Sequence, residues 1–237
     1  MRLTKISAKT IRQQVYNQLK KKIISSEILP GQRMTLQGLA NEFGVSVMPV
    51  REALWQLESE KVIVIESNKR IYVKRLKPAE MEELLEIRLV LESRLVEKAC
   101  GRIPENILPN LKRLLEGMDG AYGNHKRWAA LNNQFHFTIY SYAESPMLLG
   151  IIDSIWARIG PYLNMNWLKS EDFSFLMKCH KGLYHALAKN NNKKAKEWLQ
   201  IDLRGAAKII IPHLESSEII QEKDSPERTI QETRIAR

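Results

Sequence analysis

Hydrophobic residues in the first 60 positions recur every three or four residues, which is the period of an α-helix. Turn-forming residues separate three such stretches: a Pro-Gly pair ends the first, and Gly44 ends the second. The pattern therefore predicts helices over residues 10–25, 36–43 and 46–60. The second turn is short, as the two helices of a helix-turn-helix require.

Residues 62–75 change to a pattern typical of strands. Two runs rich in Val and Ile flank the polar tip Ser67–Arg70, which predicts a β-hairpin. At the start of the third helix, Ser46 has the side chain of an N-cap residue, and Pro49 is tolerated in the first turn. Three helices followed by a hairpin predict a winged helix-turn-helix domain over residues 1–75.

The remainder of the chain has the helical period almost throughout, with interruptions rich in Gly, Pro, Asn and Ser. Helices are expected near 79–101, 105–119, 124–143, 146–167, 171–190 and 192–217. The fold class is therefore mainly α, with the winged domain followed by an all-helical bundle. We expect a linker at 76–79, the helical domain at 80–215 and a polar, flexible tail at 216–237.

Positive charge is concentrated at the N-terminal end of the chain. Residues 1–76 contain 14 Lys and Arg against 6 Asp and Glu, so they carry +8 of the formal net charge of +10. This surplus favours a polyanion such as nucleic acid as the partner of the first domain. Two cysteines, and no apolar stretch suited to a signal peptide or a membrane span, predict a cytoplasmic protein without a membrane partner.

The third predicted helix has one apolar face for the core and a second face for a ligand. The second face consists of Met48, Arg51, Glu52 and Trp55. Arg51 is its only cation and can pair with guanine or with a phosphate in the major groove of DNA. Cations at the hairpin tip can contact phosphate beside the groove. A solvated surface is the alternative for each single cation, whereas the whole pattern predicts DNA binding.

Two motifs of this domain, LANEFGVS (39–46) and PVREAL (49–54), resemble those of GntR-family bacterial transcription regulators. The resemblance implies binding to double-stranded operator DNA. Val47 stands where the family usually has an arginine, so Val47 offers only an apolar contact and Arg51 is expected to be the main polar reader. The expected DNA-binding residues are Arg33, Gln37, Ser46, Val47, Met48, Arg51, Asn68, Lys69 and Arg70.

Three later stretches resemble the FCD branch of that family, the FadR-type effector domain. They are LLEIRLVLESRLVEKAC (84–100), NNQFHFTIYSYAESPML (132–148) and HKGLYHALAKNNNKKAKEWLQIDL (180–203). The family holds a divalent metal with one aspartate and three histidines on inward helix faces. The resemblance assigns these positions to Asn132, His136, His180 and Asp202, with Asn132 replacing the aspartate and Asp202 replacing a histidine. Zn, Ni or Mn is the expected metal. The alternative is that the histidines form hydrogen bonds within a polar pocket.

The same resemblance implies that Arg88 binds the carboxylate of a small-acid effector near the metal, a task that suits a guanidinium group. Arg158 and Tyr162 are further expected effector-binding residues. The alternative for Arg88 is a surface ion pair with Glu92 or Glu83.

Together these features predict a ligand-responsive bacterial transcription regulator that acts as a repressor and binds a palindromic operator as a homodimer. A small carboxylic acid and a divalent metal would bind in its helical effector and dimerisation domain. The nucleotide-binding and hydrolase motifs that mark common enzymes are absent from the sequence, so we expect no catalysis. One alternative is a metal-dependent enzyme with an accessory DNA-binding domain. Another is a nucleic-acid-binding protein without sequence preference.

Overall fold

The computed structural model describes residues 11–67, 70–163 and 170–223. Its contacts divide the chain into two compact units. The first unit runs to Arg75 and also includes the part of helix α7 (Pro146–Leu163) from Asp153 onward, and the second unit contains the rest. Both units are mainly helical, which confirms the predicted fold class. None of the helices in these ranges has the combination of length and hydrophobicity that crossing a bilayer requires.

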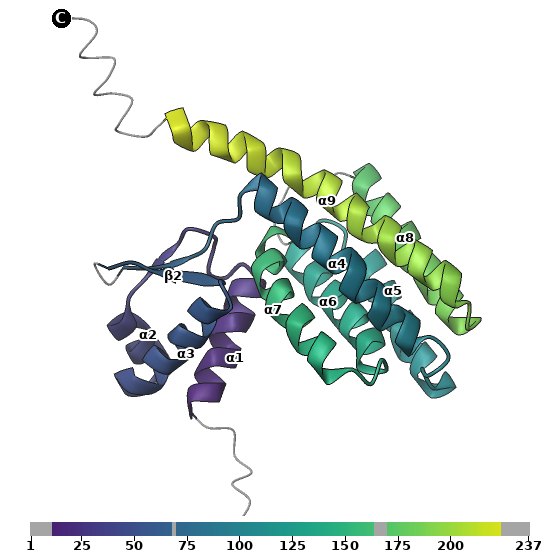
Figure 1. Cartoon of the computed structure of the whole chain (residues 1–237), viewed down its shortest axis with the longest axis horizontal. Helices are drawn as coiled ribbons and strands as arrows, with labels where there is room; N and C mark the ends of the chain where they lie inside the picture. Colours follow the sequence, from purple (N-terminus) through teal and green to yellow (C-terminus); the bar gives the residue numbers. More distant parts are fainter. Residues whose placement is uncertain (1–10, 68–69, 164–169, 224–237) are drawn as a thin grey trace, which may run out of the picture. The chain divides into compact units, whose positions relative to one another are not determined.

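Three helices build the first unit, at the positions that the hydrophobic period predicts. They are α1 (Ile11–Ile24), α2 (Leu36–Phe43) and α3 (Val47–Ser59). Their apolar faces meet in one core, in which Leu19, Val50 and Leu57 have no exposed surface. Figure 1 shows these helices in purple and dark blue.

A small antiparallel sheet completes the first unit. Strands β2 (Ile63–Ile65) and β3 (Ile71–Val73) form the predicted hairpin, and β1 (Arg33–Met34) pairs with the other side of β3. The sequence pattern did not predict β1, because two residues are too few to show the alternation of a strand. Met34 of β1 is buried opposite Ile71, so this short strand contributes to the core.

The turn between α2 and α3 depends on Gly44. Its backbone is left-handed, with φ 64° and ψ 35°, a conformation that glycine adopts without steric cost. The next amide, that of Val45, donates to the carbonyl oxygen of Ala40 at 3.1 Å and closes the end of α2. The short turn therefore delivers the chain directly into α3.

Ser46 precedes α3 with an extended backbone, but its side chain makes no capping hydrogen bond. Ser46 thus occupies the N-cap position that the sequence predicts, and only the capping hydrogen bond of its hydroxyl is missing. An N-cap side chain accepts from the second or third amide of its helix, and the third residue of α3 is Pro49, which has no N–H. The exposed hydroxyl of Ser46 therefore lies at the start of α3 without serving as its cap.

The second unit is a bundle of long helices. Its elements are α4 (Pro78–Ala99), the 3₁₀ turn η1 (Glu105–Ile107), α5 (Leu108–Asp119), α6 (His125–Ser141), the first part of α7, α8 (Ser170–Ala188) and α9 (Asn192–Lys223). Helix α4 packs against α6 and α9, while α5 packs against α6 and α8. Helix α9 also packs along α8, so it lies between α4 and α8, as Figure 1 shows.

Two helix boundaries differ from the predicted ones. Helix α4 begins at Pro78, within the expected linker, and the Glu80 carboxylate accepts the backbone N–H of Lys77 at 3.1 Å. Helix α9 continues to Lys223, because no Gly or Pro follows Pro212 in this stretch to end it. The expected tail beyond residue 223 lies outside the described residues.

Two residues of α3 test which face of this helix supports the core. Leu57 is fully buried, whereas Trp55 is 55% exposed. Leu57→Ala should destabilise the first unit by about 2–5 kcal/mol because it leaves a cavity. Trp55→Ala should change the stability by about 0.5 kcal/mol or less. Urea unfolding followed by hydrogen–deuterium exchange in residues 11–73 measures both effects, and equal losses would contradict the assigned faces.

Candidate functional site

Helix α3 presents one continuous face to solvent. Its buried residues are Val50, Ala53, Leu54 and Leu57, and its exposed residues include Met48, Arg51, Glu52 and Trp55. Arg51 is the only Lys or Arg of this helix, so it is the one cation that α3 can offer to a polyanion. This is the division of faces that the sequence predicts for a helix that enters a DNA groove.

Most of the other residues predicted to contact DNA are exposed as well. Arg33 on β1, Gln37 on α2 and Arg70 beside β3 all have exposed side chains. Asn68 and Lys69 at the hairpin tip lie outside the described residues. Arg33 and Arg70 thus add exposed cations on β1 and beside β3 to the one on α3.

Val47 and Met48 differ in solvent exposure more than the sequence indicated. Val47 is partly buried and packs against the core of the first unit. Met48 is 53% exposed and lies on the same face as Arg51. The apolar surface at the N-terminal end of α3 therefore comes mainly from Met48.

A second candidate site lies inside the helical unit, where four polar side chains meet. Asn132 and His136 lie one turn apart on α6, His180 lies on α8 and Asp202 lies on α9. Each is at most 5% exposed. The four residues that the family resemblance singles out thus meet in one buried cluster.

The polar atoms of this cluster are within a few ångströms of one another. The Nε2 atoms of His136 and His180 are 3.1 Å apart, and His180 Nε2 is 2.7 Å from Asn132 Oδ1. Asp202 Oδ2 lies 3.5 Å from His136 Nε2. Ligand atoms of the two histidines and of Asp202 all lie within 4.8 Å of one another, which is close enough to share one metal ion.

The partners of the two Nδ1 atoms determine what the Nε2 atoms can do. His180 Nδ1 lies 2.7 Å from the carbonyl oxygen of Leu176, which can only accept, so this nitrogen carries the proton. His136 Nδ1 lies 3.1 Å from the hydroxyl of Tyr140, and that hydroxyl donates its own proton to Glu92. Each neutral imidazole therefore directs the lone pair of Nε2 into the cluster.

Burial favours the uncharged forms of His136 and Asp202. It lowers the pKa of His136 well below its usual value, and electrostatic repulsion from the neighbouring His180 and Arg88 lowers it further. Burial also raises the pKa of Asp202, although His180 and Arg88 act in the opposite direction. The neutral Nε2 atoms and the Asn132 oxygen are acceptors that converge within this cluster.

The cluster fits a cation by its chemistry. Among the described residues, Asp202 Oδ1 has no hydrogen-bond partner although it is buried. The nearby His180 Nδ1 lies 3.5 Å away and gives its proton to Leu176 instead. Lone pairs that converge on one point repel one another, and a divalent metal placed there would be coordinated by them. Imidazole, carboxylate and amide oxygen all serve as ligands for such a metal.

Arg88 belongs to the same buried region. It is 7% exposed, and its Nε–H donates to Glu92 Oε1 at 2.5 Å, while Glu92 has no exposed surface. The predicted alternative of an ion pair with Glu92 is thus present, but the pair is buried rather than on the surface. Its charge acts on the pKa of both His136 and Asp202, so Arg88 lies close enough to influence a ligand at the cluster.

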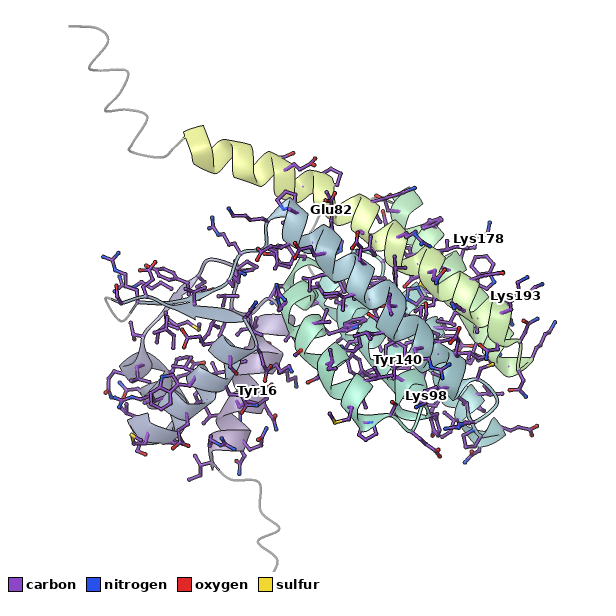
Figure 2. The ribbon with its side chains drawn as sticks, viewed as in Figure 1. Tyr16, Glu82, Lys98, Tyr140, Lys178 and Lys193 are labelled. Atoms are coloured by element: carbon purple, nitrogen blue, oxygen red, sulfur yellow. The ribbon has the colours of Figure 1, made fainter. Side chains whose placement is uncertain are left out.

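Sequence reasoning missed Tyr140 as part of this site. Its hydroxyl joins Glu92 to His136, and burial together with Glu92 raises its pKa well above the usual value. Figure 2 shows Tyr140 within the bundle, whereas Lys178 and Lys193 extend from its surface. The available signal was its spacing of four residues from His136, which places both side chains on one face of α6.

Arg158 and Tyr162, the other two expected effector-binding residues, lie on the part of α7 that groups with the first unit. Tyr162 is buried, and the Arg158 Nε atom is buried without a hydrogen-bond partner among the described residues. Their role in binding an effector stays a prediction.

Comparisons with known proteins agree with both halves of this description. The model of the family "Bacterial regulatory proteins, gntR family" matches residues 11–73, and that of the "FCD domain" matches residues 83–205. The solved structure of McbR/YncC from Escherichia coli covers 89% of this chain and all of its own, with a TM-score of 0.78 and 25% identity.

Curated relatives are transcription regulators as well. The HTH-type transcriptional regulator McbR of Escherichia coli is 31% identical over 153 residues, which cover 64% of this chain and 69% of that protein. The gluconate operon transcriptional repressor of Bacillus licheniformis is 29% identical over 174 residues, 69% of this chain and 70% of that protein. These relatives are regulators rather than enzymes, in agreement with the expectation of no catalysis. The chain belongs to the GntR family of bacterial transcription regulators, in the branch with an FCD domain.

Proposed function

We propose that this protein is a cytoplasmic transcription repressor whose binding to a palindromic operator is controlled by a small carboxylic acid and a divalent metal. The observation that carries the ligand-dependent part is the buried convergence of acceptor atoms from Asn132, His136, His180 and Asp202 close to Arg88. Asp202 Oδ1 is a buried oxygen without a hydrogen-bond partner among the described residues, and a bound cation would supply that partner.

Zn, Ni or Mn would be held by the two Nε2 atoms, the Asp202 carboxylate and the Asn132 amide oxygen. The bound metal would supply positive charge that attracts the carboxylate of an acid. Asn132 gives the site one carboxylate fewer than an aspartate at that position would. We therefore expect weaker metal binding than with an aspartate there.

Arg88 would bind the acid itself. Its planar guanidinium suits a carboxylate, and it is already buried beside the acceptor cluster. Glu92 accepts the Arg88 Nε–H, so an incoming carboxylate would share this guanidinium with Glu92.

Operator binding would use two copies of the chain. Helix α3 of each copy would enter a major groove, with the two half-sites about 34 Å apart. Ile87 and Val90 are 42% and 69% exposed and lie three residues apart on α4, so they form an apolar strip that a second copy can cover. The acid would change operator affinity by binding more tightly to one arrangement of the two DNA-binding units than to another.

Metal binding is tested with His136→Ala. After treatment with a chelator, Zn²⁺, Ni²⁺ or Mn²⁺ at a hundredfold excess over Kd should stabilise the unmodified chain by about 2.7 kcal/mol and so raise its melting temperature. His136→Ala should abolish this stabilisation. His185→Ala is the matched control, because His185 is an exposed histidine on the same helix as His180. An undiminished shift in His136→Ala would mean that the histidines have only a structural role.

Tyr140→Phe tests the hydrogen bond that orients His136. Without the hydroxyl, the Nδ1–H of His136 loses its acceptor, and metal affinity should fall about 10- to 100-fold. Competition with a chelating dye measures the change. Tyr184→Phe on α8 removes the hydroxyl of a partly buried tyrosine and should leave the affinity unchanged. Equal affinities of Tyr140→Phe and the unmodified chain would refute this role.

Arg51→Ala tests sequence-specific DNA binding. If Arg51 reads a base, the preference for a selected operator over random duplex should fall about 5- to 150-fold, equivalent to about 1–3 kcal/mol. Mobility shifts at rising salt measure the preference, and Arg113→Ala, an exposed arginine of α5, is the control. A uniform loss on both duplexes would assign Arg51 to a phosphate instead. A chain that binds no duplex even at low salt would refute the proposal.

A further inference from the structure

The N-terminal end of α3 is where this protein can distinguish one base from another. In helix-turn-helix proteins the first residues of the recognition helix contact base edges, and later residues lie farther along the groove. Met48 is the second residue of α3, and Trp55 follows seven residues later, about 10 Å farther along the helix axis. Met48 therefore occupies the end that meets the bases.

Met48 offers an apolar, flexible surface at this place. Its side chain is 53% exposed, whereas Val47 beside it packs against the core. A single exposed methionine is ordinary on a protein surface. Met48, however, lies at the end of the helix that would face the DNA bases. Arg51 lies three residues on, on the same side of the helix, and can hold the helix to the DNA by its charge.

The chemistry of the major groove then selects the base. Guanine, adenine and cytosine present hydrogen-bonding groups at their edges, and only thymine adds an apolar group, its 5-methyl. A thioether has no proton to donate and accepts only weakly, so it gains nothing from the polar edges. Its polarisable, unbranched chain is suited to contact with a methyl group.

We propose that Met48 reads a thymine in each operator half-site by contact with its 5-methyl group. This inference rests on operator binding through α3, as proposed above. It assigns base selectivity at the start of the helix to an apolar contact, with Arg51 as the neighbouring polar contact.

The test begins with operator sequences selected from a random duplex pool by the full-length protein. In these duplexes each thymine is replaced in turn by deoxyuridine, which keeps the base pair and removes only the methyl group. At one position of each half-site the replacement should weaken binding about four-fold, the effect of one buried methyl group. In Met48→Ala, the ratio of the affinities for the thymine and deoxyuridine duplexes should fall from about four to about one. Met48→Leu keeps an apolar side chain and should retain the four-fold ratio.

Trp55→Ala is the matched control, an exposed apolar residue on the same helix. It should leave the thymine-to-deoxyuridine ratio unchanged, whatever it does to the overall affinity. Selected duplexes that are insensitive to deoxyuridine at every position would overturn the inference and leave operator binding intact. A four-fold preference for thymine over deoxyuridine that persists in Met48→Ala would also overturn the inference. A pool without any enriched sequence would instead refute operator binding itself, and the inference with it.

Discussion

The ion pair between Arg88 and Glu92 is the interaction on which the interior of the helical unit depends. Each of these charges would cost several kcal/mol to remove from water without a partner. Glu92 also accepts a hydrogen bond from the Tyr140 hydroxyl, so the Tyr140 oxygen is left to accept a hydrogen bond from His136. One buried chain of hydrogen bonds thereby joins α4 to α6 and directs a lone pair of His136 toward α8 and α9. The geometry of the buried cluster of Asn132, His136, His180 and Asp202 therefore depends on the charge balance of the neighbouring Arg88–Glu92 pair.

In the first unit, by contrast, the candidate DNA-contacting side chains on α3 are exposed to solvent and the core is apolar. Helix α3 carries one cation, yet its first turn adds partial positive charge from amides that have no partner within the helix. Ser46 does not cap this turn and Pro49 contributes no amide, so water or a phosphate must solvate the remaining donors. The start of α3 can therefore attract a DNA backbone although the helix is poor in Lys and Arg.

Much of this structure could be predicted from local pattern, and the exceptions have local causes. The four-residue spacing of Asn132 and His136 places them on one helix face, but their meeting with His180 and Asp202 depends on how helices pack, which periodicity does not encode. Only the family resemblance supplied that set. Strand β1 was too short to show a pattern. Helical periodicity placed Met48 on the exposed face of α3, but nothing in the sequence showed that Val47 packs against the core. Tyr140 lies four residues after His136, and in the sequence an aromatic residue at that spacing cannot be told from an ordinary core residue.

The complete burial of Glu92 also restricts how this sequence can change over time. A substitution that removes Arg88 alone leaves an uncompensated carboxylate in the bundle, and one that removes Glu92 alone leaves an uncompensated guanidinium and deprives Tyr140 of its acceptor. Either intermediate is penalised by about 3–5 kcal/mol, a large share of the stability of an ordinary domain. Drift at these positions is therefore confined to paired replacements, and Arg88, Glu92 and Tyr140 must evolve as a single unit.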